Sequence, residues 1–127
     1  MNKKPNIIIF NPDQMRADSL HHLGNPASIT PTLDQMAAAD SVSFRNAFCQ
    51  NPVCVPSRCS FMTGLYPHVH GHRTMGHLLH AEEPSLLKEL KDAGYYVWAN
   101  ARNDLVAEQF PGQIESHVTE LYYGGNS

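Results

Sequence analysis

The chain contains the stretch Cys54-Val55-Pro56-Ser57-Arg58-Cys59-Ser60-Phe61-Met62-Thr63-Gly64-Leu65-Tyr66-Pro67, which predicts a loop that runs into a short helix. Pro56 has a fixed φ and no N–H to donate, so it suits the first helical position. Gly64 stands where a left-handed C-cap would end the helix. The free N–H groups of the first turn and the positive end of the helix dipole would then lie beside Cys54. Together they predict an anion-binding site.

Arg58 lies one helical turn beyond Cys54. At this spacing its guanidinium can form two parallel hydrogen bonds to an oxyanion, or hold the Cys54 side chain. The residues therefore predict a reactive side chain, helix N–H donors and an arginine around one anion. The alternative is that Cys54 is a buried structural cysteine at a helix start.

The segments Cys54-Val55-Pro56-Ser57-Arg58 and Thr63-Gly64-Leu65-Tyr66-Pro67 resemble the signature of the sulfatases, within the alkaline-phosphatase-like superfamily. The resemblance implies that Cys54 is oxidised after translation to formylglycine, an aldehyde whose hydrate is a geminal diol. One hydroxyl of the diol attacks the sulfur of a sulfate ester, and the second lets the diol collapse to the aldehyde and expel sulfate. Cys54 is then the precursor of the nucleophile, and Arg58 stabilises the oxyanion of that nucleophile. A formylglycine-generating enzyme is an implied partner.

A metal site is predicted after the first apolar run. Asn6-Ile7-Ile8-Ile9-Phe10, ended by Asn11-Pro12, predicts a buried strand of a parallel sheet. Asp13 and Gln14 follow at the carboxyl end of this strand, where open α/β sheets bind ligands. An aspartate there is otherwise a turn residue or a cap. The resemblance implies a divalent cation, most suitably Ca²⁺, with Asp13 as a ligand, Gln14 as a weaker one through its amide oxygen, and Cys54 in its modified form as a further ligand. Such a metal acts as a Lewis acid and activates the diol oxygen.

Further elements are predicted along the chain. They are a helix that begins with Thr30 as N-cap and Pro31 as first helical residue, a strand over residues 41–48, a helix over residues 84–93 with Pro84 in its first turn and Gly94 closing it, a buried strand over residues 95–99 with Trp98 in the core, and a strand over residues 117–123. The predicted fold class is α/β, with helices flanking a mostly parallel sheet. The resemblance implies an alkaline-phosphatase-like fold that is incomplete in this chain.

The turn Asn100-Ala101-Arg102-Asn103-Asp104-Leu105 is expected to face the same crevice as Asp13 and Cys54. Many sulfatases have Gly-Lys-x-His-Leu here, with the lysine and histidine contacting the sulfate and the nucleophile. Arg102 falls at the position of the lysine and is predicted to be a catalytic clamp on a sulfate oxygen. Asp104 falls at the position of the histidine but does not keep its role, because a carboxylate near a sulfate is repulsive unless it is protonated, paired or facing a cationic substrate group. An ion pair between Arg102 and Asp104 across the turn is the alternative.

Alternating histidines follow the signature at positions 68, 70 and 72. Such a pattern can bind a transition metal, but neither carboxylates nor cysteines cluster nearby to complete a site. We therefore predict that His72 lines a substrate cleft, with Arg73 or His77 as alternatives.

Composition and charge argue against several other classes of protein. The chain has 127 residues, 42% of them hydrophobic and 17% charged, as is usual for a globular protein, and a net charge of -3, which gives no basic footprint for nucleic acid. No apolar run approaches the about 20 residues of a membrane span, and the N-terminal apolar run is too short for a signal peptide. We therefore predict no nucleic-acid partner, no membrane contact and a cytoplasmic location. The three cysteines fit neither a disulfide framework nor a zinc site, so Cys49 and Cys59 are predicted to be small buried residues.

Residues 1–127 are predicted to be the N-terminal segment of a sulfatase-like catalytic domain whose remainder is absent from this chain, because such domains are several times longer. The implied function of the full-length protein is hydrolysis of a small-molecule or carbohydrate sulfate ester, and this chain alone should have no appreciable activity. Two alternatives remain open. One is a phosphonate monoester or phosphodiester hydrolase with the same nucleophile, and the other is a non-catalytic binding segment whose Cys54 stays a thiol.

Overall fold

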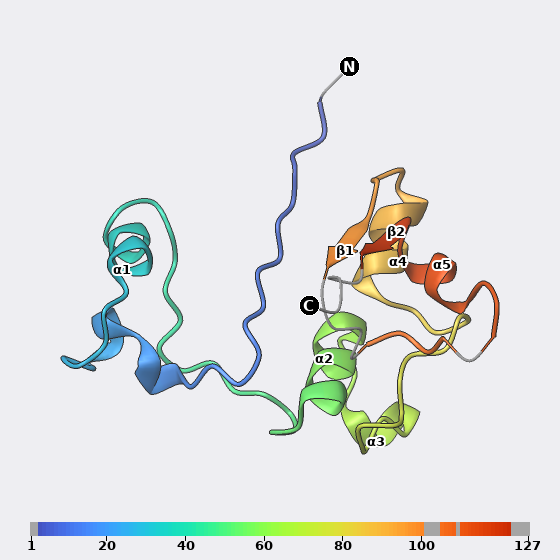
Figure 1. Ribbon diagram of the computed structural model, residues 1–127, viewed down its shortest axis with the longest axis horizontal. Coiled ribbons are helices and arrows are strands. Elements are labelled where there is room, and N and C mark those ends of the chain that lie inside the picture. Colours follow the sequence, from blue (N-terminus) through green and yellow to red (C-terminus); the bar gives the residue numbers. More distant parts are fainter. Residues whose placement is uncertain (1–2, 101–104, 109, 123–127) are drawn as a thin grey trace. The chain divides into compact units, whose positions relative to one another are not determined.

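A computed structural model describes residues 3–100, 105–108 and 110–122 of the chain (Figure 1). The chain divides into two compact units, Met1–Ala47 and Phe48–Ser127, which we call the N-terminal and C-terminal units. Arg102, Asp104 and the last residue of the predicted strand over residues 117–123 lie outside the described residues.

The N-terminal unit is built around helix α1 (Pro31–Ala38), which begins where the sequence predicts it, with Thr30 as N-cap and Pro31 as first helical residue. Two 3₁₀ turns precede it, η1 (Ala17–Ser19) and η2 (His21–Leu23). His22 joins η2 to α1, because its backbone N–H donates to Asp34 Oδ1 at 3.1 Å and its Nδ1 lies 3.2 Å from the same oxygen. His22 Nε2 lies 2.9 Å from Ser43 Oγ, which attaches the segment after α1 to the same point.

The two strands predicted in the N-terminal unit do not form. Residues 6–10 and 41–48 are irregular, and two of their large apolar side chains, Ile8 and Phe44, are 90% and 76% exposed. A strand needs a neighbouring strand to pair with its backbone N–H and C=O groups, and no strand is present among residues 3–47 to serve as one. The prediction of a buried strand over residues 6–10 is therefore wrong for this structure.

The C-terminal unit contains the helix that carries the sulfatase-like signature, together with further helices and the sheet (Figure 1). Its elements in chain order are α2 (Cys54–Thr63), α3 (Pro67–His70), α4 (Leu86–Asp92), β1 (Trp98–Asn100), α5 (Gln113–His117) and β2 (Glu120–Tyr122). Strands β1 and β2 pair in parallel, with Trp98 opposite Glu120 and Asn100 opposite Tyr122. A parallel pair requires a crossover connection, and α5 lies within it. The unit is thus a small α/β fold with a two-stranded parallel sheet.

Both strands are shorter than predicted, and Trp98 is not in a core. Its side chain is 52% exposed, and its ring stacks on that of Tyr122 with centroids 6.5 Å apart. The neighbouring Tyr96 is also exposed, and its hydroxyl donates to Glu120 Oε2 at 2.6 Å. Side chains alternate between the two faces of a strand, and these aromatic rings stand on a face that remains open to solvent here.

The core of the C-terminal unit lies on one side of α2, where Val55 and Cys59 pack with Leu79. Leu79 forms an isolated parallel bridge with Val106: its N–H donates to Leu105 O, and the N–H of Ala107 donates to Leu79 O, both at 2.8 Å. Burial, with a smaller effect from the negative charge of Glu83, raises the pKa of the Cys59 thiol to about 12. The prediction of a buried Cys59 is confirmed.

The prediction of a buried cysteine is wrong for Cys49, whose side chain is exposed. Cys49 lies in the irregular segment before α2, where no described helix or strand covers it. The difference between Cys49 and Cys59 therefore comes from the helix, which turns one side toward the core.

Helix α4 is held to α5 through a buried histidine. Ser85 is the N-cap of α4, and its Oγ accepts from the N–H of Lys88 at 3.2 Å. The same oxygen lies 2.8 Å from Nδ1 of His117, whose Nε2 lies 2.9 Å from His80 O. This network assigns the proton of His117 to Nε2, because the Ser85 hydroxyl can donate to Nδ1 while Nε2–H donates to the carbonyl. Because Ser85 is the N-cap, Pro84 precedes the helix. The prediction that Pro84 lies in its first turn is wrong.

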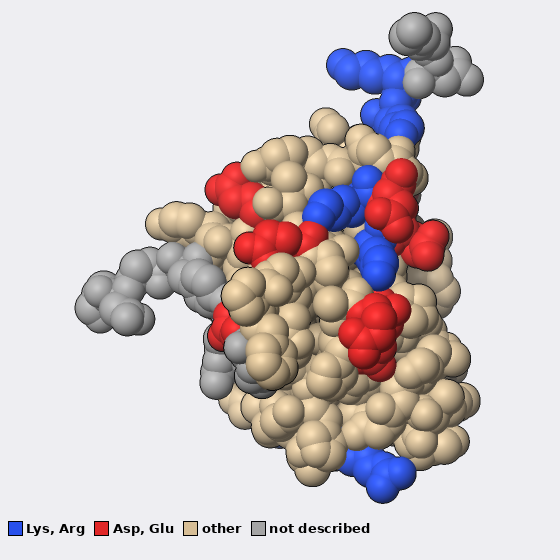
Figure 2. All heavy atoms as spheres, turned by 90° about the vertical axis from the view of Figure 1, so that its right-hand side faces the viewer, with Lys and Arg blue, Asp and Glu red and all other residues tan. Residues whose placement is uncertain are grey.

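Charges of both signs occur on the surface. On the face in Figure 2, Lys and Arg side chains lie interspersed with Asp and Glu side chains. Among the described residues, none of the helices has the length and apolar character needed to cross a bilayer.

Candidate active site

The signature stretch forms helix α2, as predicted, with Cys54 as its first helical residue and Val53 as N-cap. The helix ends at Gly64, which has a φ of +72° and donates its N–H to Ser60 O at 2.9 Å. Pro56 is the third helical residue and not the first, which corrects the prediction. The position is still compatible with proline, because N–H groups in the first turn have no acceptor within the helix.

Cys54 and Arg58 come together on one face of α2, since residues four apart in a helix are neighbours on its surface. Both side chains are half-buried. Cys54 Sγ stands at the N-terminal end of the helix, beside the positive end of the dipole, and lies 2.9 Å from Met75 Sδ. The structure therefore places the cysteine at the helix N-terminus and the arginine one turn further along the same helix, and their catalytic roles stay predictions.

Three side-chain hydrogen bonds hold α2 and the residues just before it. The N–H of Val53 donates to Asn51 Oδ1 at 3.0 Å, and Ser60 Oγ donates to Gln50 Oε1 at 3.2 Å. At the other end, Thr63 Oγ1 donates to Cys59 O at 2.7 Å. Residues 50–53, which lead into Cys54, are thus hydrogen-bonded both among themselves and to Ser60 in the middle of the helix.

The predicted metal ligands Asp13 and Gln14 are adjacent exposed residues of a turn in the N-terminal unit, whereas Cys54 belongs to the C-terminal unit. Gln14 has a φ of +54° and is the only non-glycine residue with positive φ in the described part of the chain. Such strained backbone is concentrated at functional sites. The oxygen donors of Asp13 and Gln14 fit a hard cation such as Ca²⁺. Nowhere in residues 3–100, 105–108 and 110–122 do three or more His, Cys, Asp or Glu side chains form a group that could hold a metal ion.

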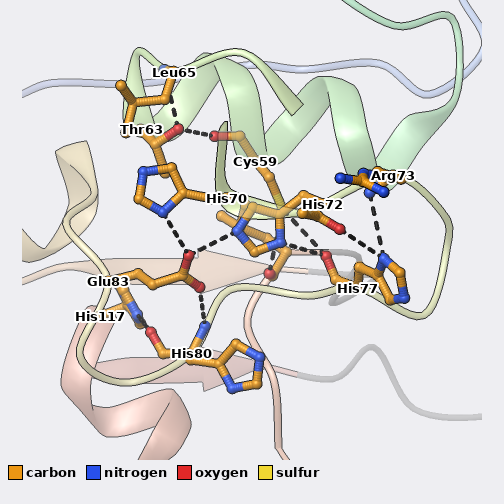
Figure 3. Close-up of polar contacts among 12 residues, drawn as sticks. Cys59, Thr63, Leu65, His70, His72, Arg73, His77, His80, Glu83 and His117 are labelled. Atoms are coloured by element: carbon orange, nitrogen blue, oxygen red, sulfur yellow. Dashed lines mark hydrogen bonds and ion pairs between the residues drawn. The ribbon is translucent and has the colours of Figure 1, made fainter. Parts of the chain in front are cut away.

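The structure places His72 in the interior. The side chain is only 4% exposed, and its two ring nitrogens lie 2.7 Å from His77 O and 2.9 Å from Glu83 Oε1 (Figure 3). Its contact with substrate stays a prediction. Arg102, predicted to be a sulfate clamp, and Asp104, predicted to bind substrate, lie outside the described residues.

Sequence reasoning missed Glu83, whose carboxylate is the common partner of three histidines (Figure 3). Glu83 Oε1 faces both His72 Nε2 and His70 Nδ1, the latter at 3.2 Å, and Oε2 accepts from the N–H of His80 at 2.7 Å. Burial alone would raise the pKa of Glu83, but the hydrogen bonds from His80 and His72 and the charge of His72 outweigh it and hold the pKa below its ordinary value. No spacing rule connects a glutamate to a histidine 11 residues before it, so the sequence carried no signal for this pair.

Comparisons with known proteins agree with the signature. Residues 5–120 match the sulfatase family. An ulvan-active sulfatase from Formosa agariphila is 39% identical over 92 residues, which are 72% of this chain and 18% of that protein. An arylsulfatase from Clostridium perfringens is 38% identical over 96 residues, 73% of this chain and 19% of that protein. The human N-acetylgalactosamine-6-sulfatase is 38% identical over 104 residues, 72% of this chain and 20% of that protein.

The chain therefore belongs to the sulfatase family. It spans about a fifth of the length of the curated relatives that it matches. No solved structure gives a significant match.

Proposed function

We propose that the full-length protein of which this chain is a part hydrolyses sulfate esters, with Cys54 converted to formylglycine as the nucleophile. The observation that carries this proposal is the position of Cys54 as first residue of α2, with Arg58 one turn beyond it. The first-turn N–H groups and the guanidinium would supply positive charge to a sulfate oxygen and to the oxyanion of the nucleophile. When formed, the hydrated aldehyde supplies a hydroxyl nucleophile and a second hydroxyl that permits release of sulfate.

The proposed substrate is a carbohydrate or small-molecule sulfate ester. The relatives are an ulvan-active sulfatase, an arylsulfatase and an N-acetylgalactosamine-6-sulfatase, so the family identity supports sulfate as the group removed and leaves the alcohol open. Arg102 is proposed to bind a sulfate oxygen, and Asp104 to face a cationic group of the substrate. A formylglycine-generating enzyme is the proposed partner that modifies Cys54.

Asp13 and Gln14 are proposed to hold one side of a divalent metal ion, most suitably Ca²⁺. Their carboxylate and amide oxygens are the donors that this cation prefers, and parts of the full-length domain outside this chain would supply further ligands. When bound, the metal supplies Lewis-acid stabilisation of a sulfate oxygen and of the nucleophile. Asp13 fixes the cation by charge, and Gln14 completes the pair without adding a second negative charge.

The complete domain is proposed to have an alkaline-phosphatase-like fold with a larger, mostly parallel sheet. The support is the exposure of apolar runs that contain residues typical of strands, such as Ile8 and Phe44. The two-stranded sheet of the C-terminal unit already has the parallel pairing that such a sheet requires. Strands at residues 6–10 and 41–48 would then depend on neighbours supplied by the rest of the domain.

Peptide mass spectrometry of the full-length protein from its native host tests the nucleophile. Cleavage after Arg45 and Arg58 gives one peptide that contains both Cys49 and Cys54, and fragment ions distinguish the two. We expect an aldehyde at Cys54 and a thiol at Cys49. An unmodified Cys54 in a host with a working modifying system would exclude the formylglycine mechanism and favour a non-catalytic binding segment.

A phosphonate monoester or phosphodiester hydrolase with the same nucleophile is the second candidate. Gln14 in the metal pair, together with Arg102 and Asp104 in place of a lysine and a histidine, favours it. Assay of the full-length protein on matched aryl sulfates, phosphonates and phosphodiesters separates the two. A clear preference for the phosphorus substrates would replace the sulfatase assignment.

A further inference from the structure

We propose that the buried His72–Glu83 pair is a positioning device that holds Met75 over Cys54. Met75 lies at the tip of a short segment, residues 71–77, which we call the Met75 loop. The significance of this cover for catalysis rests on the proposed function, since that function makes Cys54 the precursor of the nucleophile. The positioning itself is a property of the thiol protein and is tested without turnover.

The Met75 loop is closed by its own hydrogen bonds. Gly71 O accepts from the N–H of Arg73 at 2.8 Å and from His77 Nδ1 at 2.7 Å. The N–H of His77 donates to Thr74 O at 3.1 Å, which makes a turn with Met75 in a central position. The loop therefore has a defined shape that places the Met75 side chain at its tip.

The His72–Glu83 pair closes the base of this loop (Figure 3). His72 Nδ1 faces His77 O at 2.7 Å, and Nε2 faces Glu83 Oε1 at 2.9 Å, so each ring nitrogen has an oxygen partner. Glu83 also faces His70 Nδ1 and accepts from the N–H of His80, which joins the chain before the loop to the chain after it. Because the His72 side chain is almost fully buried, these bonds are shielded from competing water.

The loop contacts α2 at two points. Its last carbonyl, His77 O, lies 3.9 Å from Sγ of the buried Cys59, while at its tip Met75 Sδ lies 2.9 Å from Sγ of Cys54. Two residues further on, Leu79 is fully buried in the core against α2. The base of the loop is therefore anchored to the core, and the tip is left to cover or uncover the thiol. Release of the base should allow Met75 to move away from Cys54.

The test is site-resolved alkylation of the full-length protein, produced in a host that lacks the modifying enzyme so that Cys54 remains a thiol. The native protein is treated with iodoacetamide, and the rates at the three cysteines are read by peptide mass spectrometry. Cys49 is exposed and serves as the reference, whereas the buried Cys59 reports global unfolding. The measured quantity is the ratio of the alkylation rate at Cys54 to that at Cys49.

Met75→Ala removes the cover and should raise this ratio with Cys59 still protected. Glu83→Gln should raise it by about tenfold or more, the change in local opening expected for loss of one charge-assisted hydrogen bond. The amide keeps one acceptor oxygen and replaces the other with an NH2 donor, so it cannot accept from both His72 and His80 as the carboxylate does. Glu82→Gln is the matched control, because it makes the same change of charge at the exposed neighbouring carboxylate and should leave the ratio unchanged.

The double variant decides whether Glu83 acts through Met75. If it does, Glu83→Gln has no further effect in the Met75→Ala background, and the two changes are fully non-additive. The proposal is overturned if Met75→Ala leaves the ratio unchanged, or if Glu83→Gln raises it equally with and without Met75. If Glu83→Gln makes Cys59 reactive, Glu83→Asp, which keeps the charge and shortens the side chain, replaces it in the same cycle with the same two outcomes.

Either result is independent of sulfatase activity. If Cys54 carries an aldehyde in the native host and Met75→Ala has no effect on the alkylation ratio, the proposed function stands and the proposal that Met75 covers Cys54 is overturned. If Met75→Ala raises the alkylation ratio but Cys54 is never converted to an aldehyde, Met75 does cover Cys54 and the proposed formylglycine mechanism is overturned.

Discussion

At the scale of single residues, Arg58 connects the helix to the proposed chemistry. It lies on the same face of α2 as Cys54, one turn from the N-terminus, and is half-buried. A guanidinium in this position offers planar, two-pronged hydrogen bonding to an oxyanion, which a lysine ammonium does not. The shape of the cation is therefore as important here as its charge.

This reasoning predicts the effect of Arg58→Lys. The substitution keeps the charge but loses the fork, and we expect kcat of the full-length enzyme for an aryl sulfate to fall about 10²-fold, as for loss of a preorganised donor. Arg16→Lys is the control, because Arg16 is exposed and pairs only locally with Asp18 in the described structure. An unchanged kcat for Arg58→Lys would remove Arg58 from the catalytic group.

At the scale of elements, the end of α2 depends on a left-handed backbone conformation. Gly64 has a φ of +72°, and a Cβ added there would meet no atom within 4 Å. We expect Gly64→Ala to lower the free energy of unfolding by about 1 kcal/mol, the cost of a left-handed conformation for an L-residue. Gly76→Ala is the matched control, because its surroundings are equally open and its φ is not in the left-handed range. Equal denaturation midpoints for the two variants would contradict this account.

Helix α4 depends on a side-chain cap that also satisfies a buried histidine. Ser85→Ala removes the acceptor of the Lys88 N–H and the donor to His117 Nδ1. We expect a loss of about 2 kcal/mol in the free energy of unfolding, at the upper end of the range for caps, because His117 is fully buried. Urea denaturation measures it, and Ser116→Ala, at a half-buried serine whose hydroxyl donates to Gln113 O, should cost much less. A loss no greater than that of the control would show that the cap is dispensable.

At the scale of the whole molecule, Glu83 makes stability depend on pH. Its pKa is held below the ordinary value of 4.5, so the unfolded chain takes up the proton at a higher pH than the folded protein does. The stabilisation is complete above the unfolded pKa and is lost as the pH falls through the lowered folded pKa.

The urea midpoint of the wild-type protein should therefore fall as the pH drops below about 4.5. Glu83→Gln should show a shallower fall over the same range, because the amide does not titrate, and Glu82→Gln should retain the wild-type slope. Parallel curves for the wild type and Glu83→Gln would show that Glu83 contributes nothing to acid sensitivity.

Much of the C-terminal unit was predictable from local signals. The C-cap at Gly64 and the position of Arg58 one turn beyond Cys54 follow from spacing within a single helix. The sequence predicted a mostly parallel sheet, but which two segments pair in it is a property of the tertiary structure. The strands at residues 6–10 and 41–48 were predicted from equally clear patterns and do not form. A strand, unlike a helix, forms its backbone hydrogen bonds with another segment. An apolar pattern therefore predicts a strand only where a neighbouring strand is present to pair with it.

By itself, the sequence determined the family, the helix that carries Cys54 and the arginine one turn beyond it, because the bonds that make a helix are local. Only the tertiary structure decided that Glu83 would bind His72 and that Met75 would lie on the Cys54 thiol. These contacts join residues 11 and 21 positions apart, and they form because packing around Leu79 brings the chain back to α2. Such contacts leave no periodic trace in the sequence, since each depends on the path of the whole chain between its two residues.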